Sequence, residues 1–184
     1  MRTIRTLAAV AGSAALLTLA QLSAAPVPVE INGAFKGATE GGSGCPRWLL
    51  RVPPHDGGKV EFVKGENGLA LKVTTGKKKV SCLSKEQIKA KIGDEILVDL
   101  KASGKGSFRI NAYMYGAHNG KYLSTLAGKK LAAPEKSSPV SQTLKVAAKS
   151  EVGHLMVVIV VLPGSEVTLE DVKVQYEAKE KAAE

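Results

Sequence analysis

Polar and aromatic residues alternate with apolar ones in the segment Gly106–Tyr122, which reads GSFRINAYMYGAHNGKY. The outward set would be Arg109, Asn111, Tyr113 and Tyr115. Side chains along a strand point to opposite faces in turn, so this pattern predicts one face in the core and one in solvent. Aromatic rings can cover the C–H faces of sugar rings, and planar amide and guanidinium groups can bond the hydroxyls around them. The outward set therefore predicts a surface that contacts carbohydrate.

The turn after this strand extends the predicted surface. The segment His118–Lys121 has Asn-Gly at its centre, the dipeptide typical of a two-residue hairpin loop. That loop would place Tyr122 beside Tyr113 and Tyr115, with His118 as a contact at the rim. A loop one residue longer would turn Tyr122 away. Tyrosine is also favoured in strands for packing alone, so a partly buried edge of the core is the alternative.

Two other ring residues are interpreted from their neighbours. Trp48 is the single tryptophan and a further candidate for carbohydrate contact, although Leu49 and Leu50 beside it favour a place in the core. His154 enters an apolar run and is predicted to be structural.

Short β-patterned runs separated by Gly, Pro, Asn, Asp and Lys dominate the chain after residue 25. The predicted strands are 27–32, 47–51, 59–63, 69–74, 79–83, 88–92, 95–102, 107–115, 121–126, 141–146, 154–162 and 166–176. Strands at this spacing, without an amphipathic helix of useful length, predict an all-β sandwich or barrel. Both parities are apolar from Leu155 to Leu162, which predicts a central strand covered on both faces. In the last predicted strand, the alternation of apolar residues shifts by one position at Glu170-Asp171, which predicts a β-bulge.

Residues 1–25 have the features of a secretory signal peptide. Arg2 and Arg5 give a positive start, the stretch Leu7–Ala20 is apolar, and small residues end the segment at Ser23–Ala25. The apolar stretch is shorter than the roughly 20 residues that a bilayer span needs. We therefore expect a secreted or periplasmic protein without a membrane span.

The rest of the chain has the length of a single domain, which we place at residues 26–176, followed by a charged tail at residues 177–184. Its two cysteines, Cys45 and Cys82, are predicted to form a disulfide because an exported protein meets an oxidising compartment. Two buried free thiols are the alternative. The pair lacks the close CxxC spacing of a zinc site, so no bound metal is expected there.

The formal net charge of +9 falls to +7 without Arg2 and Arg5. Most of the positive charge is lysine, and the densest run is Lys77–Lys79, which is typical of a solvated turn. Such a surface can attract a polyanion. Nucleic acid is not an expected partner, because arginine is scarce, aromatic residues make up 4% of the chain and export is predicted.

Four motifs, taken in order, resemble a known family. They are VEINGAF, CPRWLL, IGDEILVDLKASGKGSFRINAYMY and VTLEDVKVQY. Their order and spacing over Val29–Tyr176 resemble the jelly-roll carbohydrate-binding modules that accompany xylanases, cellulases and laminarinases, a galactose-binding-like β-sandwich. The resemblance implies a jelly-roll β-sandwich of two antiparallel sheets that binds polysaccharide without catalysis.

The chain departs from that family in two ways. Lys36 stands where the family commonly has a glutamate near a structural calcium, and a lysine repels that ion. Asp171, with Glu170 before it, could still hold calcium together with carbonyl groups, and no other cofactor is expected. Family members are usually joined to an enzyme, whereas this chain is essentially the module alone. That difference leaves two expectations: the module acts with a separate partner such as a glycoside hydrolase, or the fold has been recruited to another role.

Two other functions remain open. An exported structural or envelope protein would use the same sandwich to bind proteins, and the low aromatic content favours it over a strong sugar binder. A jelly-roll polysaccharide lyase would use Arg109, Tyr113, Tyr115 and His118. The HExxH, P-loop and GxSxG motifs of other enzyme classes do not occur in the sequence. We therefore expect a protein without catalytic activity.

Overall fold

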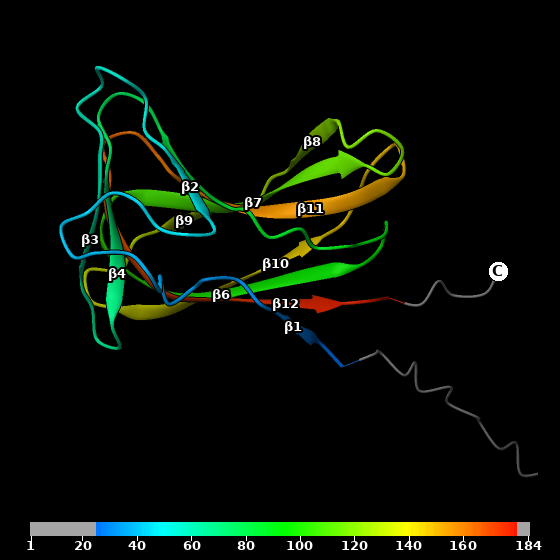
Figure 1. The fold of residues 1–184 in the computed structure, drawn as a ribbon, viewed down its shortest axis with the longest axis horizontal. Coiled ribbons are helices and arrows are strands. Elements are labelled where there is room, and N and C mark those ends of the chain that lie inside the picture. Colours follow the sequence, from blue (N-terminus) through cyan, green and yellow to red (C-terminus); the bar gives the residue numbers. More distant parts are fainter. Residues whose placement is uncertain (1–24, 180–184) are drawn as a thin grey trace, which may run out of the picture.

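The structure, a computed structural model, describes residues 25–179. Residues 1–24, which hold nearly all of the predicted signal peptide, and residues 180–184 lie outside the described part. The described chain forms two six-stranded sheets, packed as the two layers of a sandwich (Figure 1). Within residues 25–179 there is no helix long and apolar enough to cross a membrane. The prediction of an all-β sandwich of two antiparallel sheets is confirmed.

The first sheet, sheet A, has the order β10-β6-β12-β4-β3, with β1 paired to the free part of β12. Its strands are β1 (Val27–Val29), β3 (Lys59–Lys64), β4 (Leu69–Thr74), β6 (Glu95–Lys105), β10 (Ser138–Lys145) and β12 (Glu166–Glu177). In Figure 1 it forms the lower layer, and β3 and β4 turn steeply upward at one end. Strand β12 pairs with β4 through its first half and with β1 through its last residues.

The second sheet, sheet B, has the order β2-β5-β11-β7-β8, with β9 paired to the start of β7. Its strands are β2 (Trp48–Arg51), β5 (Val80–Ser84), β7 (Ser107–Gly116), β8 (Tyr122–Leu126), β9 (Lys130–Ala132) and β11 (Val152–Val161). It forms the upper layer of Figure 1. Its inner face packs on sheet A, and its outer face is directed away from that sheet.

The main core lies between the two sheets and holds the predicted inward set of β7, from Phe108 to Met114 in alternate positions. Strand β11 lies between β5 and β7, and both of its faces are buried. Leu155 and Ile159 point into the main core, whereas Val158 and Val160 belong to a second apolar cluster on the outer face. The prediction of a central strand covered on both faces is confirmed.

The Asn-Gly motif near the start packs against the predicted bulge of β12. The register of β12 on β6 shifts between Glu170 and Lys173, and Asp171 has a φ of 49°, so the bulge is confirmed. A Cβ atom on Gly33 would lie 1.6 Å from the carbonyl oxygen of Val172, so only glycine fits here. Asn32 closes the turn, because its Oδ1 accepts a hydrogen bond from the Lys36 backbone N–H at 2.8 Å.

Two element predictions were wrong. Residues 88–92 do not form a strand, and only Ile88 pairs, in an isolated bridge with Leu155. Strand β9 was not predicted, because its three residues are too few to show an alternation. It is held by its pairing with the start of β7, which is a tertiary contact.

The predicted disulfide is also absent, because Cys45 and Cys82 are both free and buried. Cys82 points into the core from β5, and burial raises the pKa of its thiol to about 12. The Cys45 sulfur instead lies beside the Asn32 turn, where Asn32 Nδ2 donates to it at 3.3 Å. Burial raises the pKa of this thiol too. Chain spacing and compartment do not determine where two Cβ atoms point, and a disulfide depends on that geometry.

Candidate functional site

The predicted strand residues lie on the outer face of sheet B, in rows that cross the strands. The first row, the aromatic row, consists of Tyr122, Tyr115 and His154 on β8, β7 and β11. Tyr113 lies in the next row, between Thr125 and Met156. Residues directly opposite on paired strands project to the same side, so these side chains share one surface.

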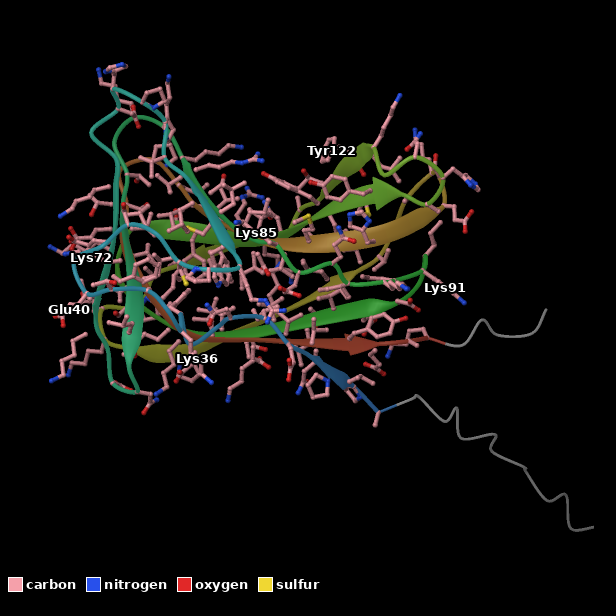
Figure 2. All side chains as sticks on the ribbon, viewed as in Figure 1. Lys36, Glu40, Lys72, Lys85, Lys91 and Tyr122 are labelled. Atoms are coloured by element: carbon pink, nitrogen blue, oxygen red, sulfur yellow. The ribbon has the colours of Figure 1, made fainter. Side chains whose placement is uncertain are left out.

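The aromatic side chains form a contiguous cluster. The Tyr122 ring meets Tyr113 edge-on at a centroid distance of 5.8 Å and Tyr115 at 6.1 Å. The Tyr115 ring stacks on the His154 ring at 4.7 Å with an interplanar angle of 7°. Tyr122 is 54% exposed, and Figure 2 shows it on β8, above β7 and on the side away from sheet A. We call these four residues the aromatic cluster.

The hairpin that presents Tyr122 differs from the prediction. Tyr122 is opposite Tyr115, so residues 117–121 form the loop, and the Gly116 N–H donates to the Lys121 carbonyl oxygen at 2.9 Å. A register shift between Met114 and Tyr115 adds a bulge in β8. The two-residue loop was therefore wrong. Tyr122 still shares the face of Tyr113 and Tyr115, because a direct cross-strand partner always projects to the same side.

Arg109 and Asn111 are partly committed to the scaffold. The buried Asn111 side chain accepts a hydrogen bond through Oδ1 from the Gly128 N–H at 2.9 Å. Arg109 Nη1 donates to the Gly128 carbonyl oxygen at 3.2 Å. Both residues thus hold the segment between β8 and β9 against the sheet. Asn111 is only 8% exposed, so its main role is structural, whereas the half-buried Arg109 keeps further guanidinium donors.

Trp48 and His118 lie apart from the cluster. Trp48 is 4% exposed, its Nε1–H donates to the Asn32 carbonyl oxygen at 2.8 Å, and its ring packs 5.7 Å from Phe35. It is a core residue, so the prediction that it contacts carbohydrate was wrong. His118 lies in the hairpin loop with 88% of its side chain exposed, and its Nε2 is 3.4 Å from a carboxylate oxygen of Glu151.

An apolar centre lies between the aromatic row and the far end of the face. Leu83, Val158 and Val160 are at most 4% exposed, and Tyr113 and Met156 pack against them. The alternation of β11 predicted apolar residues on both sides but not what the outer ones contact. His154 was predicted to be structural, but its register opposite Tyr115 places it in the aromatic cluster. The sequence does not reveal that His154 pairs with Tyr115, so it could not predict this place.

The acidic pair considered for calcium binds the turn between β3 and β4. Glu170 Oε2 accepts the Glu66 backbone N–H at 3.0 Å, and Asp171 Oδ2 accepts Asn67 Nδ2 at 2.9 Å. The Lys101 ammonium group lies 4.0 Å from the same Asp171 oxygen. Within residues 25–179 no three His, Cys, Asp or Glu side chains gather as a metal site.

Comparison with known proteins shows which solved structures share this architecture. No family model matches the sequence, and no curated protein matches it. Among solved structures, a family 4 carbohydrate-binding module (CBM4) aligns with a TM-score of 0.53 at 13% identity, over 79% of this chain and 97% of the module. The family 11 module from Clostridium thermocellum, in complex with a β-1,3-1,4-mixed-linked tetrasaccharide, aligns with a TM-score of 0.51 at 7% identity, over 74% and 93% of the two chains.

The fold is that of the jelly-roll carbohydrate-binding modules. A cyclase from Fischerella sp. TAU, in complex with 4-(1H-indol-3-yl)butan-2-one, shares it with a TM-score of 0.57 at 12% identity, over 86% of this chain and 100% of the cyclase. The active domain of tailspike protein 4 from bacteriophage CBA120 aligns with a TM-score of 0.54 at 8% identity, and this chain spans 21% of its length. Identities this low establish the jelly-roll fold alone, so the function must be argued from the site.

Proposed function

We propose that the protein is an exported, non-catalytic carbohydrate-binding domain that holds a polysaccharide against the outer face of sheet B. The observation that carries this proposal is the aromatic cluster, in which Tyr113, Tyr115, Tyr122 and His154 from three strands meet on one surface. Exposed rings that are fixed by packing offer apolar area at little entropic cost. The sugar ring would lie against Tyr122, the most exposed of the four.

Polar groups suited to sugar hydroxyls border these rings. The Tyr122 hydroxyl and Thr125 Oγ1 lie 2.7 Å apart, and each keeps further bonding capacity. Arg109 contributes guanidinium donors toward the far end of the face. The aromatic area would give affinity, and these groups would orient the chain. By analogy with modules of the same fold, we propose that a separate glycoside hydrolase acts on the same polysaccharide.

The residues of the lyase alternative do not meet at one point. Arg109 and Tyr115 are six residues apart on β7, which corresponds to about 20 Å along a strand. His118 lies beyond the strand in the hairpin loop, beside Glu151. A base, an acid and a charge stabiliser must lie within hydrogen-bond reach of one reacting sugar. This set of residues therefore supports binding rather than elimination chemistry.

Affinity electrophoresis against a panel of soluble neutral and acidic polysaccharides tests the proposal. Tyr122→Ala removes an exposed ring, so the fold should survive while the dissociation constant rises about tenfold, as expected for the loss of roughly 1–2 kcal/mol of stacking. Tyr122→Phe keeps the ring and loses only the hydroxyl that meets Thr125, so it is the matched control.

Retardation that Tyr122→Ala weakens and Tyr122→Phe largely preserves would support stacking on the cluster. Equal effects of the two substitutions would show that the hydroxyl, and not the ring, matters. If no glycan in the panel retards the folded protein, glycan binding is wrong and the protein-interaction alternative gains. New ultraviolet absorbance on incubation with a uronic acid polymer would show that the protein is a lyase.

A further inference from the structure

Negative charge is distributed unequally between the two sheets. In the strands of residues 25–179, every Asp and Glu belongs to sheet A. The strands of sheet B contain no carboxylate, and their charged residues are Arg51, Arg109 and Lys130. The strands of sheet A therefore carry carboxylates beside their lysines, whereas the strands of sheet B contribute only positive charge.

The three cations of sheet B lie in one cross-strand row. Lys130 is opposite Arg109, Arg109 is opposite Val160, Val160 is opposite Ser81, and Ser81 is opposite Arg51. Paired residues share a side of the sheet, so all five project from the outer face. We call this the cationic row. It crosses the sheet from β9 to β2 at the opposite end of the face from the aromatic row.

A surface depression of about 500 Å³ lies where the cationic row reaches β2. Its lining consists of Arg51, Val52, Pro53, Lys78, Lys79 and Ser81. The volume is within the range of about 300–1,000 Å³ that is usual for ligand sites. The depression thus adds two lysines from the loop before β5 to the cations of the row.

The loop that carries Lys78 and Lys79 is held in place by contacts with Asp56. Asp56 Oδ2 accepts the Lys78 backbone N–H at 2.7 Å, and a Cβ atom on Gly76 would lie 1.8 Å from the Asp56 carbonyl oxygen. The loop therefore packs closely on the segment between β2 and β3, which Figure 1 shows at the top of the end where β3 and β4 turn upward. The Asp56 carboxylate thus has a backbone partner, and this bond orders the loop before any ligand arrives.

The cations of this end are not neutralised by other side chains. Across the described residues, no ion pair joins Arg51, Lys78, Lys79, Arg109 or Lys130 to a carboxylate. By contrast, Lys72 and Lys101 of sheet A each pair with a glutamate, at 3.1 and 2.7 Å. Unpaired cations gathered around a depression attract an anionic ligand.

We infer that the polysaccharide bound by this face is an anionic one, with carboxylate or sulfate groups placed at the cationic row while a ring of the same chain stacks on the aromatic cluster. This inference rests on the proposed function and specifies its ligand. His154 and Val160 lie six residues apart on β11, so the two ends are about 20 Å apart, which requires an extended chain of several sugars. Between the ends, the half-buried side chains of Tyr113 and Met156 lie over the apolar centre, and their exposed parts would meet the uncharged faces of the intervening rings.

The test compares charge removal at the cationic row with equal charge removal elsewhere. The triple variant Arg51→Gln, Lys79→Gln, Lys130→Gln leaves Arg109 and its scaffold contact intact. The control Lys64→Gln, Lys145→Gln, Lys173→Gln removes three exposed lysines from sheet A strands and gives the same net charge. The probes are polygalacturonate for carboxylates, carrageenan for sulfates, mixed-linkage β-glucan as a neutral chain and single-stranded DNA as a polyanion without sugar-ring faces.

The expected result is binding of an acidic polysaccharide that the triple variant weakens about tenfold, as three exposed charge contacts would give. The control triple should change the affinity less than twofold, and Tyr122→Ala should weaken binding further. Whether polygalacturonate or carrageenan is held more tightly distinguishes carboxylate from sulfate as the anionic group. Raising the salt concentration should weaken the wild-type complex, because exposed charge contacts are screened.

Other outcomes would overturn the inference in distinguishable ways. Binding of the neutral glucan alone, unchanged in the triple variant, would leave glycan binding intact and refute the anionic ligand. Equal losses of affinity in both triple variants would show that binding depends on net charge and not on the cationic row. DNA binding as tight as polysaccharide binding would show the same. If none of the three polysaccharides binds, the proposed function itself is wrong.

Discussion

The hydrogen bond between Tyr176 and Asp94 offers the sharpest test of the fold. The Tyr176 hydroxyl donates to Asp94 Oδ2 at 2.6 Å, and Asp94 is only 2% exposed. The same carboxylate accepts the backbone N–H groups of Lys91 at 2.6 Å and Lys179 at 3.1 Å. These bonds tie the end of β12 to the turn before β6. Tyr176→Phe removes one donor from a buried carboxylate while it keeps the ring.

The expected cost follows from the charge on Asp94. A hydrogen bond to a charged group contributes about 1.5–3 kcal/mol, and two backbone donors remain, so we expect the free energy of unfolding to fall by about 2 kcal/mol in Tyr176→Phe. For a domain of this size that corresponds to a melting temperature lower by roughly 4–8 °C. Urea unfolding followed through the fluorescence of Trp48 measures it, because the single tryptophan is buried in the core.

The stability difference between wild type and Tyr176→Phe should depend on pH through the pKa of Tyr176. Burial, and then the bond to Asp94, raise the pKa of Tyr176 to about 12 in the folded protein. In the unfolded chain a tyrosine has a pKa of about 10. Since the folded pKa is the higher one, the contribution of Tyr176 is fully present below about pH 10 and is lost as the pH rises through about 12. The stability difference between wild type and Tyr176→Phe should therefore be constant from pH 7 to about 9 and shrink above about 10.

A matched control separates this bond from general effects of losing a hydroxyl. Tyr122→Phe removes a hydroxyl from an exposed side chain, so it should change the free energy of unfolding by less than about 0.5 kcal/mol. If Tyr176→Phe is no more destabilising than this control, the buried carboxylate does not depend on the tyrosine. A stability difference that stays constant to about pH 12 would refute the protonation argument.

Two further predictions concern the thiols and the scaffold of the outer face. Cys45 and Cys82 should be unreactive toward a thiol reagent at pH 8 in the folded protein, because both are buried and burial raises their pKa values. Both should react after denaturation without reductant. Failure to detect thiols in the denatured chain would show that a disulfide forms after all. Asn111→Ala should lower the free energy of unfolding by about 1–3 kcal/mol, because the buried Gly128 N–H loses its acceptor. Asn111→Asp keeps an acceptor and should retain most of the stability. Equal losses of stability for the two variants in a denaturant titration would contradict the assigned bond.

Several features of the fold could be predicted because they depend on local covalent geometry. Alternation along β7 separates Phe108 from Arg109 whatever the strand pairs with. Apolar residues at every position from Leu155 to Leu162 require cover on both faces, so the central place of β11 followed from the sequence. The phase slip at Glu170-Asp171 identified the bulge for the same reason. Each of these inferences uses only neighbours along the chain.

Other features depend on contacts between residues far apart in sequence. The apolar neighbours of Trp48 favoured the core but did not exclude carbohydrate contact, and the structure buries its ring on Phe35 beneath the Asn32 turn. His154 joins the tyrosines only through the register of β11 on β7. The Asn-Gly dipeptide predicted the right hairpin with the wrong loop, because the pairing of Tyr115 with Tyr122 overrides the local turn preference.

The sequence by itself determined which side chains alternate toward solvent and how much positive charge the chain carries. Only the tertiary structure decided that Arg51, Arg109 and Lys130, which are distant in sequence, form one row at the opposite end of the sheet from the aromatic cluster. The physical reason is that strand order and register are set by the packing of two complete sheets. Alternation fixes the side of a strand on which a residue lies, and packing fixes its neighbours.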